Sequence, residues 1–313
     1  MRLLLLGCTG FVGRELVPLL LSGGHHITLV SRRLPSAAFV AQPSDHLHWL
    51  QFDPALEQSW RDSALCEALA QADGVVNLAG EPIAEKRWTA VHRQCLEASR
   101  LETTRLLVEA IKTLAKPPEV LVNASAVGFY GTSPSDHFVE SSPVGSDFLA
   151  SLCSRWEAEA AAVPSTTRQV TVRIGIVLAA DGGALGKMLP VFRAGFGGPI
   201  GTGQQWMSWI HRSDLCALIR DALEQSTWSG VVNGVAPQPV SMTTFARELG
   251  RSLGRPSLLP VPGPVLQVLL GDGAKVVLEG QRVSSQRLEG LGFTFRYPDL
   301  PSALAAATSS RSR

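Results

Sequence analysis

Runs of apolar residues alternate with stretches of helical periodicity along most of the chain. The apolar runs have the length of strands, and they lack the polar positions that a sheet face exposed to water would show. They predict strands at residues 3–6, 27–30, 47–52, 75–78, 120–123 and 170–174. The helical stretches between them predict helices at 62–72, 89–114 and 147–162. Strands and helices that alternate in this way predict an α/β protein with a doubly wound parallel sheet.

The pattern changes after residue 180, and it predicts a second part of the molecule. Residues 181–208 contain eight glycines around one short helical stretch, which is typical of a substrate loop. Residues 209–230 are expected to return to the first domain, which spans 1–180. Short elements separated by prolines then predict a smaller, partly interleaved C-terminal substrate domain at 231–313.

The turn between the first predicted strand and the following helix carries glycines at every third position, Gly7, Gly10 and Gly13. Such a triplet also marks ordinary tight turns, but here a strand precedes it and a helix follows, with a second strand at 27–30. This arrangement predicts a Rossmann-type dinucleotide site. Gly7 permits the turn, Gly10 lets a diphosphate approach, and Gly13 allows the helix to pack on the sheet. The residues expected to bind the cofactor here are Gly7, Thr9, Gly10, Phe11, Val12 and Gly13.

The end of the second predicted strand indicates which dinucleotide binds. Proteins that bind NAD place an acidic residue there for the ribose hydroxyl groups, whereas this chain has none between Glu15 and Asp45. Ser31, Arg32 and Arg33 stand there instead, and a hydroxyl with two guanidinium groups suits a 2′-phosphate. The alternative is a pair of solvated surface arginines. We expect NADP(H) as the cofactor.

Composition excludes several other classes of protein. A hydrophobic content of 45% with 18% charged residues is typical of a packed globular protein, and a net charge of +1 gives no reason to expect binding to nucleic acid or membranes. The five cysteines are scattered, which favours a reducing compartment and argues against a zinc site. The first apolar run ends at Gly7 and is too short for a signal peptide. We therefore expect a soluble, cytoplasmic protein without a metal site.

Seven motifs spread over nearly the whole chain carry a family resemblance: GCTGFVG at 7–13, VSRR at 30–33, NLAGE at 77–81, SRLETT at 99–104, SAVGFYG at 125–131, WMSWIH at 206–211 and FRYP at 295–298. Through them the chain resembles the extended and atypical short-chain dehydrogenase/reductases. Within that group it resembles the NAD(P)-dependent epimerase/dehydratase-like proteins with a C-terminal domain of unknown role. Members are named as epimerases, sugar-nucleotide reductases or cell-division-inhibitor homologues. The resemblance therefore implies the fold and the cofactor but hardly the substrate.

The resemblance also implies further cofactor contacts. Leu78, Ala79 and Gly80, at the end of the fourth strand, are expected to line the cofactor beside the adenosine and diphosphate. Arg100 is a further contact by the same analogy, although an ordinary helix-surface arginine is the alternative. Val177 is expected on the nicotinamide side, with core packing as its alternative.

The catalytic pair of the wider superfamily is absent. Its members use a serine and a tyrosine with a lysine four residues later, because a neighbouring ammonium helps the phenol to exchange a proton near neutrality. Here Tyr130 and Tyr297 are each followed four residues later by proline. The helix that should carry the pair reads LCSRWE at 152–157. Ser125 does match the family's serine, and it is our main catalytic candidate; a turn-capping hydroxyl is the alternative.

Other candidates for chemistry are weaker. Tyr130 is an alternative proton donor or a pocket wall. Glu81 is a base, an acceptor for sugar hydroxyl groups, or a solvated loop carboxylate. Cys153 has no neighbour in sequence that would lower its pKa, which argues against a nucleophile. Around the glycine-rich loop, the candidates for substrate contacts are Lys187, Trp206, Trp209 and His211, with Trp209 expected in the core. His211 and Asp214 are too few for a metal site.

Two functions follow from these observations. The first is an NADP(H)-dependent oxidoreductase or epimerase that acts on a small polar substrate of the nucleotide-sugar kind. The second is a non-catalytic NADP-binding regulatory or scaffold protein, for example one linked to cell division. The superfamily often forms dimers through its helices, so a homodimer is expected.

Overall fold

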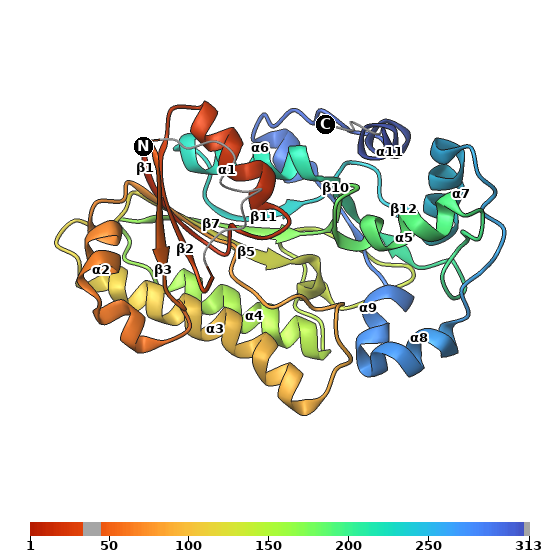
Figure 1. The fold of residues 1–313 in the computed structure, drawn as a ribbon, viewed down its shortest axis with the longest axis horizontal. Helices are drawn as coiled ribbons and strands as arrows, with labels where there is room; N and C mark the ends of the chain where they lie inside the picture. Colours follow the sequence, from red (N-terminus) through yellow and green to blue (C-terminus); the bar gives the residue numbers. More distant parts are fainter. Residues whose placement is uncertain (34–44, 310–313) are drawn as a thin grey trace.

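The computed structural model describes residues 1–33 and 45–309, and its centre is a seven-stranded sheet (Figure 1). The strands are β1 (Arg2–Leu6), β2 (His26–Ser31), β3 (Leu47–Gln51), β4 (Gly74–Asn77), β5 (Val120–Ala126), β7 (Arg168–Ile174) and β11 (Gly230–Gly234). They lie in the order β11-β7-β5-β4-β1-β2-β3, and all neighbours are parallel. The strand order reverses between β1 and β4, which is where open α/β sheets bind their ligands. The predicted doubly wound Rossmann-type sheet is confirmed.

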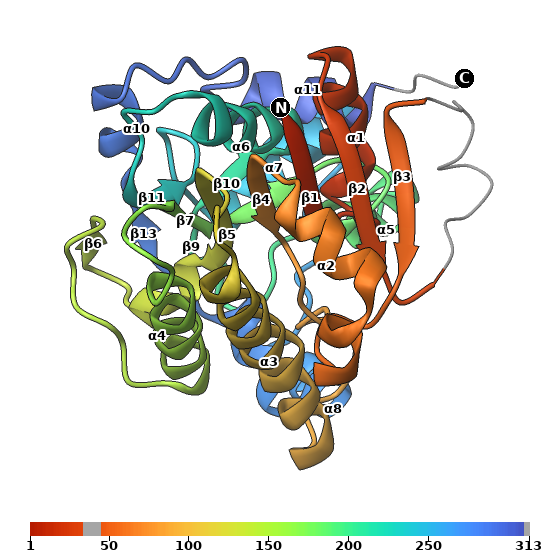
Figure 2. The same ribbon diagram turned by 90° about the vertical axis from the view of Figure 1, so that its left-hand side faces the viewer.

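Helices cover both faces of this sheet (Figures 1 and 2). On one face α1 (Gly13–Ser22) packs beside α6 (Arg212–Glu224). The other face is covered by α2 (Ser63–Ala70), α3 (Ala90–Thr113) and α4 (Phe148–Ala161), with the short 3-10 helix η1 (Glu57–Arg61) before α2. Within residues 1–33 and 45–309, no helix combines the length and the apolar composition that a membrane span requires.

The alternation of side chains in β1 explains its uninterrupted apolar sequence. Leu3 and Leu5 belong to the core under α1 and α6, whereas Leu4 and Leu6 belong to the core under α2 and α3. Successive side chains of a strand point to opposite faces, so a strand covered on both faces needs apolar residues at every position.

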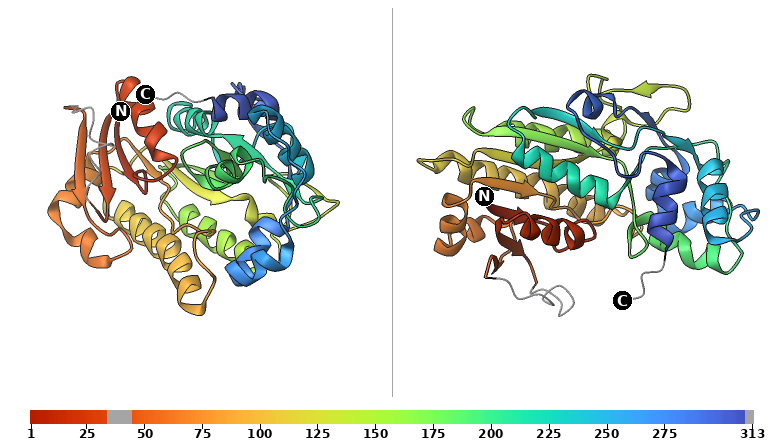
Figure 3. Two further views of the ribbon diagram at one scale, coloured as in Figure 1. Left: turned by 45° about the vertical axis from the view of Figure 1, so that its right-hand side comes forward. Right: turned by 90° about the horizontal axis from the view of Figure 1, so that it is seen from above.

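The glycine-rich region and the residues after it build a second core away from β1, β2 and β3 (Figure 3). It unites α5 (Gly183–Arg193), α7 (Met242–Leu253) and α11 (Leu300–Thr308). Trp209 is fully buried in this core, and its indole N–H donates to the carbonyl of Gln238 at 2.9 Å. The expectation that Trp209 is a core residue agrees with this placement. The division into domains stays a prediction.

Small two-stranded pairs lie outside the central sheet. Strand β8 (Ile176–Leu178) pairs with β10 (Trp209–His211), β9 (Trp206–Met207) with β12 (Val240–Ser241), and β6 (His137–Phe138) with β13 (Arg282–Val283). Residues 209–211 therefore do not join the central sheet. The chain returns to it through α6, and β11, which begins at Gly230, completes it.

The remaining C-terminal elements are α8 (Gly263–Leu270), the 3-10 helix η3 (Gly271–Ala274), α9 (Lys275–Leu278) and α10 (Gln286–Gly290). Asp214 of α6 holds the last segment in place. Its carboxylate accepts hydrogen bonds from the backbone N–H groups of Arg296 and Tyr297, at 2.8 and 3.0 Å. The buried carboxyl is thus a structural acceptor, which accounts for Asp214 without a metal.

Candidate functional site

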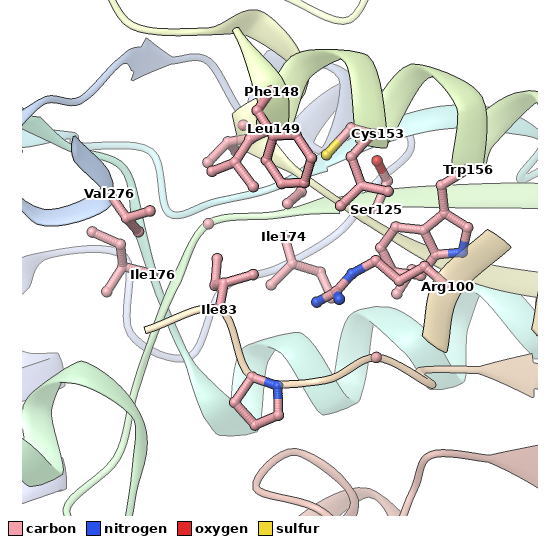
Figure 4. A pocket seen from close by; sticks show the side chains of 18 of the residues that line it. Ile83, Arg100, Ser125, Phe148, Leu149, Cys153, Trp156, Ile174, Ile176 and Val276 are labelled. Carbon is pink, nitrogen blue, oxygen red and sulfur yellow. The ribbon is translucent and has the colours of Figure 1, made fainter. Parts of the chain in front are cut away.

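A cavity of about 610 Å³ lies at the carboxyl ends of the central strands. One end is formed by the glycine turn after β1 and by the segment after β4. The other end is formed by the segments after β5 and β7, the start of α4, and α9 (Figure 4). The cavity therefore joins the expected dinucleotide site to Ser125, and its size is that of an ordinary small-molecule site.

The three glycines of the turn have different structural requirements. Gly7 has φ +73°, and a Cβ there would lie 2.4 Å from the backbone nitrogen of Ala79. A Cβ on Gly13 would lie 1.7 Å from the carbonyl oxygen of Cys8. By contrast, a Cβ on Gly10 would meet only the Gly7 carbonyl oxygen, at 3.7 Å. Protein packing thus requires glycine at positions 7 and 13, whereas position 10 is open and suits the close approach of a ligand.

Arg212 of α6 holds this turn in place. Its guanidinium donates to the Phe11 carbonyl at 3.2 Å, to Glu15 at 2.7 Å and to Asp181 at 2.6 Å. It also lies over the Phe11 ring, 4.9 Å from the centroid. Sequence reasoning missed this residue, because its partners lie far away along the chain. Of the remaining turn residues, Phe11 and Val12 line the cavity with Gly7 and Gly10, whereas Thr9 and Gly13 do not.

The residues expected to select the 2′-phosphate lie at the end of β2, outside the cavity wall. The Ser31 hydroxyl donates to the Arg33 carbonyl at 2.5 Å, and the exposed Arg32 guanidinium lies 3.8 Å from the Glu81 carboxylate. Glu81 also accepts from Lys86 at 2.9 Å, and this hydrogen bond lowers the pKa of the carboxyl. Glu81 is therefore an ion-pairing residue beside Arg32, which does not suit a catalytic base.

The other expected cofactor residues divide into two groups. Leu78, Ala79, Gly80 and Arg100 line the cavity. Arg100 is held by the carbonyls of Glu81 and Leu96, at 3.0 and 3.2 Å, and lies over the Trp156 ring, so it is not an ordinary helix-surface arginine. Val177 pairs with Ile210 and packs against the main core, while its neighbour Ile176 lines the cavity.

The Ser125 side chain is hydrogen-bonded to a buried ion pair at the cavity wall. It lies near the end of β5 and is only 3% exposed, and its hydroxyl donates to a Glu157 carboxylate oxygen at 2.6 Å. The same carboxylate accepts two hydrogen bonds from Arg173 of β7, both at 2.8 Å. The Arg173 and Glu157 side chains are 4% and 12% exposed. A buried bidentate pair of this kind fixes the carboxylate opposite the serine hydroxyl.

Tyr130 lies at the far end of this network. Its hydroxyl donates to the Asn233 side chain at 2.6 Å and accepts from Arg173 at 3.0 Å. Burial raises the pKa of the phenol, and Tyr130 is not among the residues that line the cavity. The structure therefore places the Tyr130 hydroxyl away from the position that an alternative proton donor would need.

Helix α4 presents Cys153 and Glu157 four residues apart, at the spacing of the missing tyrosine and lysine. Cys153 lines the cavity beside Ser125 (Figure 4). Burial, and then the charge of Glu157, raises the pKa of the Cys153 thiol to about 11. The thiol is thus protonated near neutrality, which argues against a nucleophile. Sequence reasoning missed Glu157 as a functional residue; its i, i+4 spacing from Cys153, on the helix where the tyrosine and lysine are expected, is the signal that could have found it.

Of the four residues expected on the substrate side, only Trp206 lines the cavity. The Lys187 ammonium donates to the Ala84 carbonyl at 2.8 Å, and Trp209 is in the second core. His211 precedes α6, and its Nδ1 accepts from the Ser213 backbone N–H. No group of three metal-ligating side chains occurs in the part of the chain that the structure describes.

The chain belongs to the NAD dependent epimerase/dehydratase family, which its residues 3–233 match. Residues 261–307 match a second family, described as a domain of unknown function (DUF1731). This assignment agrees with the resemblance carried by the sequence motifs, with the parallel sheet, and with the glycine turn at the strand-order reversal.

Relatives are similar along nearly the whole chain. The epimerase family protein SDR39U1 homolog, chloroplastic, of Arabidopsis thaliana is 42% identical over 302 residues, covering 96% of this chain and 84% of the relative. The human epimerase family protein SDR39U1 is 40% identical over 308 residues, covering 97% and 98% of the two chains. The crystal structure of human SDR39U1 (isoform 2) with NADPH superposes with a TM-score of 0.85 at 38% identity, covering 98% of this chain and 99% of that one.

Proposed function

We propose that this protein is an NADP(H)-dependent oxidoreductase or epimerase in which Ser125 and Glu157 replace the usual tyrosine and lysine. The observation that carries the proposal is the 2.6 Å hydrogen bond from the Ser125 hydroxyl to the Glu157 carboxylate. This bond lies at the wall of a cavity that continues to the glycine turn. The Glu157 carboxylate can therefore accept a proton from the Ser125 hydroxyl, and Ser125 lines the cavity in which the reaction is expected.

The residues present fit a dinucleotide. The open position at Gly10 leaves room for a diphosphate against the N-terminal end of α1, where backbone N–H groups and the helix dipole favour an anion. Arg32 and Arg33 are exposed at the end of β2, where a 2′-phosphate is expected. The crystal structure of the human relative with NADPH supports the same cofactor for this chain.

The chemistry of the proposed reaction divides between the cofactor and the protein. A bound nicotinamide supplies hydride exchange with a carbon that bears oxygen. Ser125 accepts the proton of a substrate hydroxyl through its Oγ and passes its own proton to Glu157. In the direction of carbonyl reduction Glu157 first takes up a proton from solvent and then passes it through Ser125 to the substrate oxygen. Arg173 holds the carboxylate in place with two hydrogen bonds.

Turnover of carbonyl compounds and alcohols by the purified protein tests this proposal. NADPH binding is titrated first, and cofactor oxidation is then followed with a panel of carbonyl and sugar-nucleotide substrates. We expect Ser125→Ala to bind NADPH normally and to lose about 100-fold in kcat. Tyr130→Phe is the matched control, because it removes a hydroxyl from the same network without touching Ser125. Tight NADPH binding without turnover of any compound would favour the non-catalytic alternative.

A further inference from the structure

The cavity wall around Ser125 is mostly apolar. The apolar side chains that line the cavity in Figure 4 include Ile83, Phe148, Leu149, Ile174, Ile176 and Val276, with Ile176 and Val276 on the far side from Ser125. They come from four separate parts of the fold, namely the segment after β4, helix α4, the β7–β8 region and helix α9. Apolar residues at the reacting end of a site contact a ligand through its hydrocarbon surface.

The Ser208 and Asp147 side chains of the same wall are already bonded within the protein. The Ser208 hydroxyl donates to the Gln281 carbonyl at 2.8 Å and accepts from the Val283 backbone N–H at 3.0 Å. Asp147 accepts from the Ala150 N–H at 2.8 Å and thereby caps α4. A sugar ring needs several donors and acceptors aimed at its hydroxyl groups, and these residues have their hydrogen bonds elsewhere.

The charges of the cavity do not favour a nucleoside diphosphate beside the cofactor. Three basic and three acidic side chains line the cavity: Arg93, Arg100, Lys275, Asp147, Asp272 and Glu279. Arg93 is ion-paired with Asp272, and Arg100 is held by two backbone carbonyls. Glu279 and the Thr132 hydroxyl that donates to it are exposed, as are Asp272 and Lys275. The three acidic side chains balance the three basic ones, so the cavity carries no excess of positive charge that would favour a diphosphate.

We propose that the substrate that reacts at Ser125 is an apolar carbonyl compound or the corresponding secondary alcohol, and not a nucleotide sugar. This inference rests on the function proposed above. The hydrocarbon part of the substrate contacts Ile83, Phe148 and Val276, while its single oxygen meets the Ser125 hydroxyl. Ser125 then exchanges one proton with that oxygen, and the cofactor exchanges one hydride with the carbon.

Steady-state kinetics with two kinds of probe test the substrate class. A homologous series of cyclic and aliphatic ketones is compared with UDP-glucose, with NADPH as the reductant for the ketones and NADP⁺ as the oxidant for UDP-glucose. We expect kcat/KM to rise about four-fold for each added methylene until the cavity is filled. UDP-glucose should give no turnover. Activity that does not change with chain length would overturn the assignment.

A pair of variants on α9 tests whether the rise of kcat/KM with ketone chain length depends on contact with the cavity wall. Val276 lines the cavity, whereas its neighbour Val277 does not and contributes only a backbone carbonyl to Gln205. Val276→Ser should lower kcat/KM for the larger ketones about ten-fold, and Val277→Ser should leave it unchanged. An equal effect of both substitutions would contradict the proposed contact.

The results of these experiments distinguish a failure of the apolar substrate class from a failure of the reaction proposed for Ser125. Turnover of UDP-glucose that depends on Ser125 would overturn the apolar substrate and leave the proposed reaction intact. If no compound turns over, binding of the ketones to the NADP⁺-loaded protein is measured by thermal shift. Binding that strengthens with chain length and weakens in Val276→Ser would support the apolar site although the proposed reaction fails. Absence of both binding and turnover would overturn the inference.

Discussion

Glu157 of α4 and Arg173 of β7 form a bidentate ion pair, with both nitrogen–oxygen distances at 2.8 Å and both side chains nearly buried. The pair joins a helix to a central strand directly behind Ser125. Burial of two charges is costly, and their mutual attraction offsets that cost only while both partners are present.

The first prediction concerns the stability of this pair. Arg173→Met leaves the Glu157 charge buried and unpaired, so the free energy of unfolding should fall by about 3–5 kcal/mol. The double variant Glu157→Leu/Arg173→Met should recover most of that loss. Urea unfolding measures both. A double variant less stable than Arg173→Met would show that the pair is not the reason for the loss.

The second prediction separates packing from ligand binding in the glycine turn. Gly13→Ala should destabilise the fold by more than about 4 kcal/mol, because its Cβ would lie 1.7 Å from the Cys8 carbonyl oxygen. Gly10→Ala should change stability by less than about 0.5 kcal/mol and yet weaken NADPH binding strongly. Thermal unfolding and NADPH titration test both variants. Normal NADPH affinity in a folded Gly10→Ala protein would place the diphosphate elsewhere.

The third prediction concerns the 2′-phosphate. The Arg32 side chain is 64% exposed, so its guanidinium is accessible to a phosphate even though it lies 3.8 Å from the Glu81 carboxylate. Arg32→Ala should weaken NADPH binding about ten-fold and leave NADH binding unchanged. Arg61→Ala is a control, since Arg61 is an exposed arginine that pairs with Glu57 on η1. Equal loss of affinity for both cofactors would contradict the assignment.

The fourth prediction concerns pH. Burial lowers the pKa of His211 from 6.5 to about 4; Glu15, Arg212 and Arg296 are the charged groups around it. Between pH 6.5 and about pH 4 the His211 imidazole binds a proton in the unfolded chain but not in the folded protein. Stability is therefore fully present above pH 6.5 and falls as the pH drops toward 4, by about 3 kcal/mol.

The matched variant for this effect is His211→Asn. Asparagine can still accept from the Ser213 N–H at the start of α6, but it does not titrate. Urea unfolding across this pH range should show a smaller loss of stability in His211→Asn than in the wild type. An identical loss would assign the pH dependence to other groups.

The sequence predicted those parts of the site whose residues lie close together along the chain. The glycine turn and the residues after β2 and β4 are short segments next to strands, so their positions follow from the strand pattern. Glu157, Arg173 and Arg212 could not be assigned in this way, because their partners come together only when α4 and α6 pack on the sheet. Tyr130 ends the short 3-10 helix η2 (Val127–Tyr130), and its burial against Asn233 depends on β11, which is remote in sequence. The apolar wall likewise joins four distant segments.

The rate of hydride transfer in Glu157→Gln tests the central claim most directly. Glutamine can still accept the Ser125 hydrogen bond, but it cannot take up the proton. With a ketone or alcohol that the wild-type protein turns over, we expect single-turnover hydride transfer to slow about 100-fold while NADPH affinity stays unchanged. A wild-type rate of hydride transfer in Glu157→Gln would contradict the proposed proton transfer through Ser125 to Glu157.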